Sequence, residues 1–448
     1  MEQKKILIIS YYWPPAGGPG VQRWLKFVKY LPDFGWEPTV FIPENPSYPI
    51  VDETLQKDVP KNLKMIKTKI WEPYQLAEKF GKDNKKFKAG QFDVGENQSW
   101  KAKLSIFVRG NFFIPDARVF WVKPSVEFLE KYLKANHYDV LVTTGPPHSL
   151  HLIGLGLKKK MPNLKWIADF RDPWTEISYY KHLKLTKFAD KKHRNLEEQV
   201  FRNADITLAT SYTDAENFRK KGANAFCVTN GFDSEVGSQK SEVGSQIEEN
   251  NCVPGSIPGE TRTKKFTLSY IGVLEQLRNP EILWETLNDL VSENEEFAKD
   301  FELKFVGRLD DKILKKIETS SLKNHLTNLG YQTHDVALQE MQKSSVLLMT
   351  NFPQESSKGI IPGKIFEYLA TGKTILSFGP KDADVEKILN ETKAGKHFDY
   401  EAKESLKQFI LDSYQSWKSG NLENNAENIE QFSRKNLTKN LVDLLNQL

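Results

Sequence analysis

The stretch KKILIISYYWPPAGGPGVQRW, residues 4–24, shows which class of fold to expect. A continuous apolar run leads into a turn rich in glycine and proline, and the turn leads into apolar residues at helical spacing. Those residues are Val21, Trp24, Leu25, Val28 and Leu31. A buried strand followed by an amphipathic helix is the repeating unit of α/β proteins.

The same alternation continues along the chain. Many of the strand candidates are continuous apolar runs, which is typical of strands buried on both faces of a parallel sheet. The candidates are residues 4–10, 37–43, 139–145, 165–170, 205–210 and 225–230 in the first half, and 265–272, 301–307, 326–331, 345–351 and 374–379 in the second. The pattern predicts an α/β protein with two doubly wound, Rossmann-like parallel-sheet domains.

The predicted domains are residues 1–230 and 265–425, with a basic and aromatic insertion at about 75–125. Between the domains, residues 231–264 form a polar linker in which SEVGSQ occurs twice, which we interpret as a tolerated loop insertion. A final helix within 426–448 carries an apolar stripe that must pack on another part of the chain. The stripe consists of Leu437, Leu441, Leu444, Leu445 and Leu448.

Composition excludes several classes of protein. The chain has 448 residues, a net charge of +4 and two cysteines, Cys227 and Cys252, neither in a CxxC motif. The small charge predicts no nucleic-acid partner, and the isolated cysteines predict no disulfide framework. The first apolar run is too short for a signal peptide, and no run is long enough to span a membrane. We therefore expect a cytoplasmic protein.

In open α/β sheets, ligands bind beyond the carboxyl ends of the strands, so the turns after the strands are the candidate sites. The opening turn contains Gly17 and Gly18, whose backbone can approach a ligand closely beside a helix N-terminus. The glycine spacing matches neither the dinucleotide-binding motif nor the P-loop. A phosphate or sugar hydroxyl could bind there, or the turn could simply be stiffened by proline.

The turn after residues 139–145 reads TGPPHSLHLIG and contains His148 and His151. The two histidines supply too few ligands for zinc, so no metal site is predicted. His148 is a candidate for binding substrate or carrying a proton in a cleft. The alternative is a surface histidine near a helix cap, which fits His151 better than His148.

The turn after residues 165–170 reads ADFRDPWTE and clusters Asp169, Arg171 and Asp172. Acidic and basic groups this close can pair and change each other's pKa. They could recognise hydroxyl groups or perform acid/base work in a cleft, and Asp169 is the strongest candidate. The alternative is a structural ion pair followed by a helix start.

The richest turn is ESSKGIIPGKIFEYLATGK, residues 355–373, in which a loop leads into a helix near Gly363. The loop amides and the helix N-terminus form an anion cradle, to which Lys364 adds a charge. Glu367 lies one helical turn after Gly363, where a carboxylate can accept two ribose hydroxyl groups. The predicted loop residues are Ser357, Lys358 and Gly359.

The turn after residues 265–272 adds a further cation. Asn279 and Pro280 are typical of a helix start, so Arg278 is expected just before a helix N-terminus. Arginine is suited to bidentate phosphate binding. Together with Lys364 and Glu367, it gives the second domain the features that a nucleotide diphosphate requires.

These motifs resemble glycosyltransferase family 4, the retaining, nucleotide-sugar-dependent enzymes with the GT-B fold. The resemblance covers nearly the whole chain and rests on PPAGGPGVQRW, VTNGFD, YIGVLEQLRNPE, FVGRLD, LGYQTHDVALQEM and, most specifically, PGKIFEYLATGK. The stretches RGNFFIPDARVFW, TGPPHSLH and ADFRDPW resemble bacterial cell-envelope and polysaccharide transferases. The fold thus implied has two domains facing across a cleft and a C-terminal helix that crosses back to the N-terminal domain.

The resemblance also implies residue roles. Arg278 and the loop 356–364 would hold the donor diphosphate, Glu367 the ribose, and the opening glycines would face the sugar or acceptor. Gly359 departs from the family, because it stands where the first of two glutamates is usual. We name Glu367, His148 and Asp169 as candidate catalytic residues and expect no cofactor beyond the donor. No DxD-like motif occurs, so Arg278, Lys364 and the helix N-termini would stabilise the leaving diphosphate without a metal.

The acceptor side is suggested by composition. Residues 82–123 contain nine Lys/Arg and four Asp/Glu, with aromatic residues interleaved. This mixture fits a glycan or lipid-linked acceptor and peripheral contact with the inner membrane. The alternative is an insertion whose aromatic residues, such as Phe112, Phe113 and Trp121, complete the core.

Two other functions use the same features. One is a sugar-nucleotide epimerase, which would release an epimerised donor without any acceptor. The other is a non-catalytic sugar-nucleotide-binding partner subunit, which is suggested by Gly359. A phosphorylase would require a pyridoxal-phosphate lysine context that we do not find.

Overall fold

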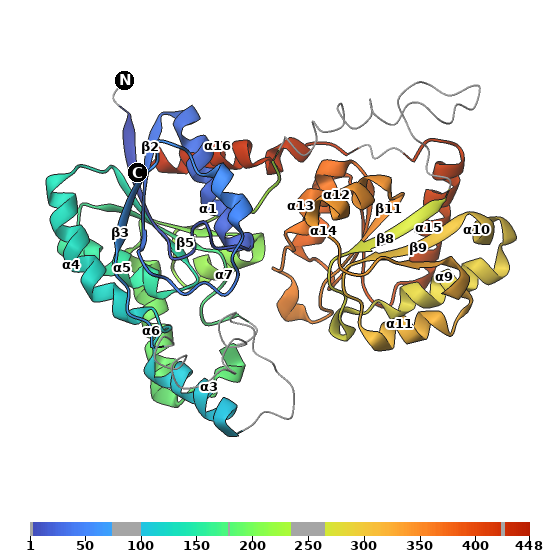
Figure 1. The fold of residues 1–448 in the computed structure, drawn as a ribbon, viewed down its shortest axis with the longest axis horizontal. Coiled ribbons are helices and arrows are strands. Elements are labelled where there is room, and N and C mark those ends of the chain that lie inside the picture. The colour runs from blue at the N-terminus through green and yellow to red at the C-terminus, as the bar shows by residue number, and fades with distance from the viewer. Residues whose placement is uncertain (1–2, 74–99, 178–179, 234–264, 423–425) are drawn as a thin grey trace. The chain divides into compact units, whose positions relative to one another are not determined.

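The computed structural model describes residues 3–73, 100–177, 180–233, 265–422 and 426–448 (Figure 1). The chain divides into two compact units, and the boundary lies where the polar linker begins. The first unit is Met1–Asn230 with Arg434–Leu448, and the second is Gly231–Ser433. Both copies of SEVGSQ and most of the predicted linker lie outside the described residues.

The first unit is built on a seven-stranded sheet with the order β3-β2-β1-β4-β5-β6-β7. Every neighbouring pair of described strands is parallel. The strands are β1 (Lys4–Ile9), β2 (Trp36–Pro43), β3 (Lys64–Thr68), β4 (Val140–Gly145), β5 (Lys165–Phe170), β6 (Ile206–Ala209) and β7 (Ala225–Cys227).

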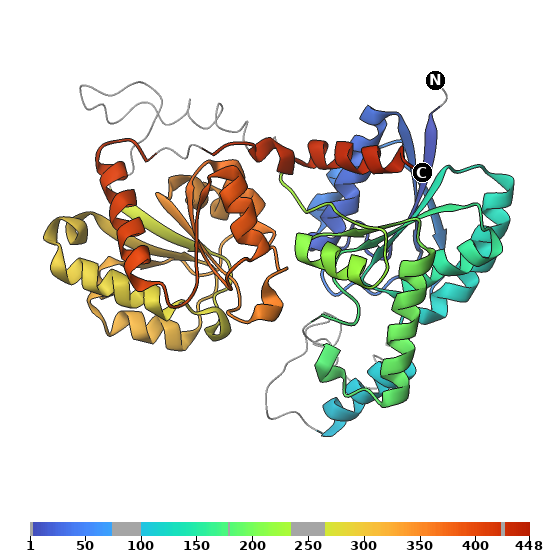
Figure 2. The ribbon, with the colours of Figure 1, turned by 180° about the vertical axis from the view of Figure 1, so that it is seen from behind.

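Helices cover both faces of this sheet (Figures 1 and 2). They are α1 (Pro19–Tyr30), α4 (Val119–Ala135), α5 (Ser149–Lys160), α6 (Lys187–Asn203), α7 (Tyr212–Lys220) and α16 (Arg434–Leu445), with short 3₁₀ helices η1 (Leu31–Phe34) and η2 (Glu53–Asp58). Helix α3 (Trp100–Phe112) lies below the sheet against η4 (Tyr180–Leu183) and α6. Because side chains alternate along a strand, Ile6 and Ile8 of β1 face one core, and Leu7 and Ile9 face the other.

The C-terminal helix α16 completes the first unit. Its residues Leu437, Leu441 and Leu445 are buried in the same core as Ile6 and Trp24. The apolar stripe seen in the sequence therefore packs beside α1, on the N-terminal sheet, as predicted.

The second unit has a six-stranded parallel sheet with the order β10-β9-β8-β11-β12-β13. Its strands are β8 (Phe266–Ile271), β9 (Phe301–Val306), β10 (Leu326–Asn328), β11 (Val346–Thr350), β12 (Thr374–Phe378) and β13 (Gly395–Phe398). Its helices are η6 (Gln276–Arg278), α9 (Glu281–Glu293), α10 (Glu295–Asp300), α11 (Asp311–Glu318), η7 (Ser321–His325), α12 (His334–Lys343), η8 (Glu355–Ser357), α13 (Lys364–Thr371), α14 (Asp384–Thr392), α15 (Lys403–Lys418) and η9 (Ile429–Phe432).

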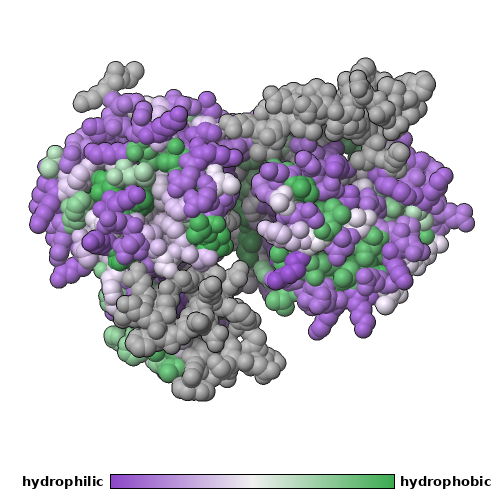
Figure 3. Space-filling model, viewed as in Figure 1, coloured by the Kyte–Doolittle hydropathy of each residue, from purple (hydrophilic) through white to green (hydrophobic). Residues whose placement is uncertain are grey.

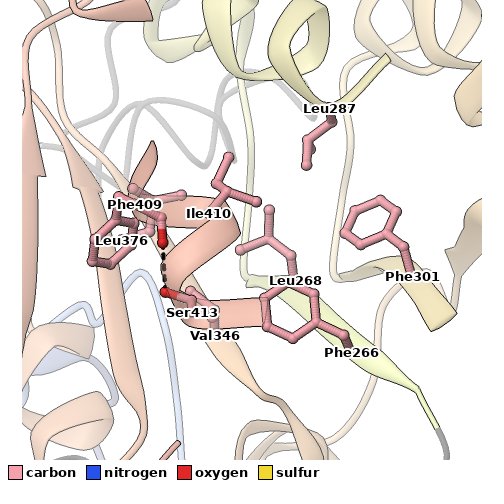
Figure 4. A pocket seen from close by; sticks show the side chains of 9 residues that line it. All are labelled: Phe266, Leu268, Leu287, Phe301, Val346, Leu376, Phe409, Ile410 and Ser413. Carbon is pink, nitrogen blue, oxygen red and sulfur yellow. Dashed lines mark hydrogen bonds between the residues drawn. The ribbon is translucent and has the colours of Figure 1, made fainter. Parts of the chain in front are cut away.

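A small apolar pocket lies between β8 and α15 in the core of the second unit (Figure 4). Phe266, Leu268 and Ile410 line it, and the Ser413 hydroxyl on its wall donates to the Phe409 carbonyl at 2.8 Å. A pocket with no polar group available to a ligand is a packing feature and not a binding site.

The predicted fold class is confirmed: each unit is a doubly wound, Rossmann-like domain, as in the GT-B fold. In each sheet the strand order reverses at one place, between β1 and β4 and between β8 and β11, and ligands bind at such switch points. Two strands, β3 and β13, were not predicted. Both are edge strands with exposed lysines, so they lack the continuous apolar run of a central strand.

No helix among the residues described is long and apolar enough to cross a bilayer.

Candidate functional site

The charged residues that the sequence predicts for a site in the second unit, Arg278, Lys364 and Glu367, lie at the switch point between β8 and β11. Lys364 opens helix α13, which follows the loop after β11. Its Nζ donates to the carbonyl of Ile271, the last residue of β8, at 3.3 Å, and lies 3.9 Å from the centre of the Tyr270 ring. The cation therefore lies where the carboxyl ends of the two strands meet.

The surroundings of Lys364 favour the binding of an anion. Burial lowers the pKa of its ammonium group, which an approaching anion would counteract. Burial alone would raise the pKa of Tyr270, but the charges of Lys364 and Arg278 lower it overall. The Thr350 hydroxyl lies beside the Tyr270 hydroxyl and also helps to lower its pKa. Excess positive charge thus occurs together with two hydroxyl groups.

Arg278 brings a second cation to this end of β8. It ends η6, and one guanidinium nitrogen donates to the carbonyl of Val273 at 2.9 Å and lies 3.8 Å from the carboxylate of Glu275. The guanidinium also lies over the Phe352 ring, 5.5 Å from its centre. Its Nε is buried without a hydrogen-bond partner, while about a fifth of the side chain, 21%, is exposed.

Glu367 lies half-buried in the first turn of α13, one turn beyond Gly363. Its negative charge acts on Lys364, so the carboxylate and the cation share one environment. Gly363 is the N-cap of this helix, and a Cβ there would meet no atom within 4 Å. Gly372 ends the helix with φ 65, the left-handed conformation that favours glycine. The predicted cradle at 355–373 thus forms a short helix with an open N-terminus.

The loop residues have different surroundings. The buried Ser357 hydroxyl lies 2.6 Å from the carbonyls of both Phe352 and Gln354, so it shapes the loop and offers no donor to a ligand. Lys358 is partly exposed and pairs with Glu355 at 2.6 Å, which raises its pKa. Gly359 lies half-buried in the same loop.

In the first unit, the opening glycines play separate parts. Gly18 is the N-cap of α1, with φ 101. No side chain caps the helix there, and a Cβ on Gly18 would meet no atom within 4 Å. The helix N-terminus therefore keeps its partial positive charge. Gly17, in contrast, donates its amide to Ile50, and a Cβ there would lie 2.9 Å from the Ile50 side chain. We had expected Gly17 to face a ligand, but it packs against this neighbouring loop.

Arg171 lies across the first turn of α1. A Cβ on Gly20 would meet its guanidinium at 1.8 Å, so any other residue there would force the Arg171 side chain to move. Its guanidinium donates to the carbonyls of Pro146 and Gly145, which connects the turns after β4 and β5. Asp172 follows on the exposed side.

The sequence predicts that Asp169 pairs with the neighbouring Arg171, but it does not. Its carboxylate is fully buried and accepts hydrogen bonds from Arg23 at 2.9 Å, Trp24 at 2.6 Å and Thr144 at 2.8 Å. A carboxylate enclosed by donors and closed to solvent has a structural role, because no proton of a substrate can reach it. Burial favours a structural role for Asp169, although its ion pair is with Arg23 and not with Arg171.

Arg23 was missed in the sequence, although it lies in the first turns of the helix after the glycine loop. It is buried and donates to the Thr229 carbonyl at 2.9 Å as well as to Asp169. It therefore connects α1 both to β5 and to the segment that follows β7.

His148 and His151 are both buried, so the surface interpretation of His151 is wrong. His148 stacks on Trp174 with ring centres 5.2 Å apart, and neither ring nitrogen has a hydrogen-bond partner. Burial and the nearby charges of His151 and Arg171 hold its pKa well below the usual value. A neutral, buried imidazole with unused nitrogens is unusual unless a ligand completes it.

His151 forms a hydrogen bond with the Thr143 hydroxyl at 2.9 Å. Its pKa is lowered to about 3, mainly by burial and to a smaller extent by the positive charge of Arg171. Its Nε2 and a ring nitrogen of His148 lie close to Gly145, where a Cβ would be 2.6 Å and 3.2 Å from them. The glycine thus allows both imidazoles to approach the end of β4.

The residues IPDAR, 114–118, position this histidine pair. Asp116 accepts from the amide and the hydroxyl of Ser149 at 2.9 and 2.8 Å, which caps α5 directly after His148. Arg118 pairs with the buried Glu72 at 3.1 Å and also bonds Tyr11, the second residue after β1. Long-range partners such as these leave no signal in the spacing of the sequence.

Among the residues that the structure describes, no group of three His, Cys, Asp or Glu side chains could hold a metal ion.

Comparison with known proteins finds relatives in structure only. No family model and no curated protein matches the sequence.

Solved structures match along the whole chain. They include HepE of Anabaena in complex with UDP and glucose, with 13% identity, TM-score 0.56 and 100% of each chain covered. The sucrose-phosphate synthase of Thermosynechococcus elongatus has 14% identity, TM-score 0.57 and 99% of each chain covered. WaaG, a glycosyltransferase involved in lipopolysaccharide biosynthesis, has 12% identity and TM-score 0.50, covering 98% of this chain and 99% of that one. At these identities, the fold is what the chain shares with them.

Proposed function

We propose that this protein is a glycosyltransferase of family 4 that moves a sugar, with retention, from a nucleotide-diphosphate sugar to a glycan or lipid-linked acceptor. The pathway we propose is bacterial polysaccharide or cell-envelope biosynthesis. The observation that carries the proposal is the grouping of Arg278, Lys364 and Glu367 at the switch point between β8 and β11. Two cations and a carboxylate beside an open helix N-terminus are suited to a nucleoside diphosphate.

The donor roles follow from these positions. Arg278 would bind the diphosphate through the exposed part of its guanidinium, and Lys364 would add charge at the same place. The carboxylate of Glu367 would accept the ribose hydroxyls. Lys358 and the backbone of Gly359 would contribute from the loop, with less effect because Lys358 already pairs with Glu355.

The residues of the first unit would bind the sugar or the acceptor. Gly18 leaves the N-terminus of α1 open, and Arg171 adds a positive charge beside its first turn. His148 is our candidate for contact with the transferred sugar, since its neutral ring has a donor and an acceptor nitrogen without partners. Both nitrogens are buried, so this contact requires the ring to turn toward the ligand. Asp169 would keep α1 and its opening loop in place.

The chemistry would depend on charge stabilisation. As the bond to the sugar breaks, negative charge grows on the departing nucleoside diphosphate. Arg278, Lys364 and the N-terminus of α13 would stabilise that charge, which is the work that a metal performs in other enzymes. Retention is implied by the family resemblance.

A thermal-shift panel of UDP-, GDP- and other sugar nucleotides tests the donor assignment. We expect one nucleotide series to stabilise the protein, and the stabilising sugar nucleotide then goes into a transfer assay with membrane and glycan acceptor fractions. Radiolabelled sugar in an acceptor fraction supports the proposal. If no sugar nucleotide raises the melting temperature, the donor assignment is wrong.

A second candidate is a non-catalytic sugar-nucleotide-binding subunit, which Gly359 favours because a usual family glutamate is absent there. Such a subunit would bind the donor and neither hydrolyse nor transfer it. The same assay separates an epimerase, since that enzyme would return an epimerised sugar nucleotide without any acceptor.

We place the proposed glycosyltransferase in the cytoplasm, at the inner face of the membrane, because a lipid-linked acceptor would present its sugar there.

A further inference from the structure

A surface of the first unit exposes large apolar side chains. We call it the α3–α6 surface, and it consists of Leu104, Phe107 and Phe112 of α3 together with Phe188 of α6. Phe112 and Phe188 are 71% and 76% exposed, whereas Trp121, close by in the sequence, is 1% exposed. Trp121 completes the core as one alternative predicted, but Phe112 does not. Figure 3 shows hydrophobic residues on the lower end of this unit.

The parts of this surface are fixed to one another. The side chain of Asn111 accepts the amide of Thr186 at 2.7 Å and donates to the carbonyl of Lys184 at 3.3 Å. Gly110 lets α3 approach η4 closely, since a Cβ there would lie 2.7 Å from Leu185. Phe112 and Phe188 are therefore held on one rigid surface.

The same surface is strongly basic. Its exposed lysines form no ion pair with any described residue; they are Lys181, Lys184, Lys187, Lys191 and Lys192. The acid among them, Asp190, is engaged by Arg194 at 3.0 Å. Phe188, Lys191 and Lys192 share one face of α6, because residues three and four apart are neighbours on a helix.

We propose that the α3–α6 surface docks on a bilayer that contains anionic phospholipid. Phenylalanine and leucine side chains can enter the boundary between headgroups and acyl chains, while the surrounding lysines bind lipid phosphates. A protein partner is the less suitable occupant, since the exposed lysines near Phe188 in the chain give the surface charges of one sign. The inference deepens the proposed location at the membrane by naming the surface that docks, and its test is separate from that of the proposed activity.

Flotation of the full-length protein with vesicles tests the inference. We expect the protein to float with vesicles in which a quarter of the lipid is phosphatidylglycerol, and to remain behind with pure phosphatidylcholine. One lysine at an anionic surface contributes about 1 kcal/mol, or roughly fivefold in binding. Lys187→Glu with Lys191→Glu should therefore reduce binding at least 25-fold, roughly the product of two such factors.

Matched controls separate this surface from net charge. Lys312→Glu with Lys315→Glu makes the same change of charge on exposed positions of α11 in the other unit and should leave binding unchanged. Phe188→Ser should weaken binding, while Phe188→Leu, which stays apolar, should largely retain it. Circular dichroism checks that each variant is folded.

Equal loss of binding in both lysine pairs would overturn the inference, as would flotation with neither kind of vesicle. The surface would be a protein interface if the folded protein bound neither kind of vesicle but formed a stoichiometric complex with another protein through Phe188. In either case the transfer assay still reports on the proposed function separately.

Discussion

The guanidinium of Arg23 and the carboxylate of Asp169 form an ion pair of 2.9 Å in which both side chains are buried. The pair joins the helix after the opening glycine loop to the end of β5. Arg23 also donates to Thr229, at the end of the first unit's first segment. Trp24 and Thr144 occupy the remaining lone pairs of Asp169, so the pair holds the glycine loop and cannot itself reach a substrate.

Removing one partner should therefore affect stability first. We expect Asp169→Ala to lower the free energy of unfolding by about 3–5 kcal/mol, because it leaves a buried guanidinium without its counter-charge. Urea denaturation followed by circular dichroism measures the change. Replacing both partners, as Arg23→Met with Asp169→Leu, should restore part of the loss. A double variant as unstable as the two single changes added together would contradict this account.

Arg278 should contribute mainly to nucleotide affinity. Hydrogen bonds to a charged group contribute about 1.5–3 kcal/mol, so Arg278→Ala should weaken binding of the stabilising nucleoside diphosphate by roughly 10- to 100-fold. Isothermal calorimetry measures it. The matched control is Glu275→Ala, which removes the carboxylate beside Arg278 and should not weaken binding. An unchanged affinity in Arg278→Ala would remove it from the site.

The two lysines of the donor loop should differ in importance. Lys364 lies over Tyr270 at the end of β8, whereas Lys358 is partly exposed and already paired with Glu355. We expect Lys364→Met to weaken nucleotide binding about 30-fold and Lys358→Met by no more than about threefold, in line with the small contribution of exposed ion pairs. Calorimetry under the same conditions compares them. Equal losses would mean that both lysines contact the ligand.

Most of the fold could be predicted from the sequence, since central strands such as β1 and β4 are continuous apolar runs. The edge strands β3 and β13 could not, because they are short, carry exposed lysines and gain their partners only in the sheet. The stripe of α16 indicated that the helix packs on another element, and the family resemblance indicated on which domain.

The site was less predictable than the fold. Lys364 and Glu367 could be placed because one short segment, with its loop, helix start and helix, positions both. The partners of Asp169, Glu72 and Asp116 could not, since each bond joins segments far apart in the chain. Local spacing pairs Asp169 with the neighbouring Arg171, whereas the fold supplies Arg23 from another helix.

Glu367 should affect turnover and leave the fold intact. It lies half-buried in the first turn of α13, so Glu367→Gln removes its charge with little change in packing. Losing its hydrogen bonds to the ribose should cost about 3 kcal/mol, or roughly 100-fold in kcat/KM. Steady-state transfer assays measure this, with the melting temperature as the control for folding. A variant with normal turnover and normal donor affinity would show that Glu367 lies outside the site.

The buried histidines should make stability depend on pH. The pKa of His151 is about 3 in the folded protein, so the folded state keeps this imidazole neutral while the unfolded chain binds a proton below its ordinary pKa. Stability is therefore complete above about pH 6.5 and falls as the pH is lowered towards 3, by about 1.4 kcal/mol per pH unit from this residue. Urea denaturation should show His151→Asn losing about 2 kcal/mol less than the parent protein between pH 7 and pH 5. If both proteins lose the same amount, His151 is not neutral in the folded state or does not stay buried.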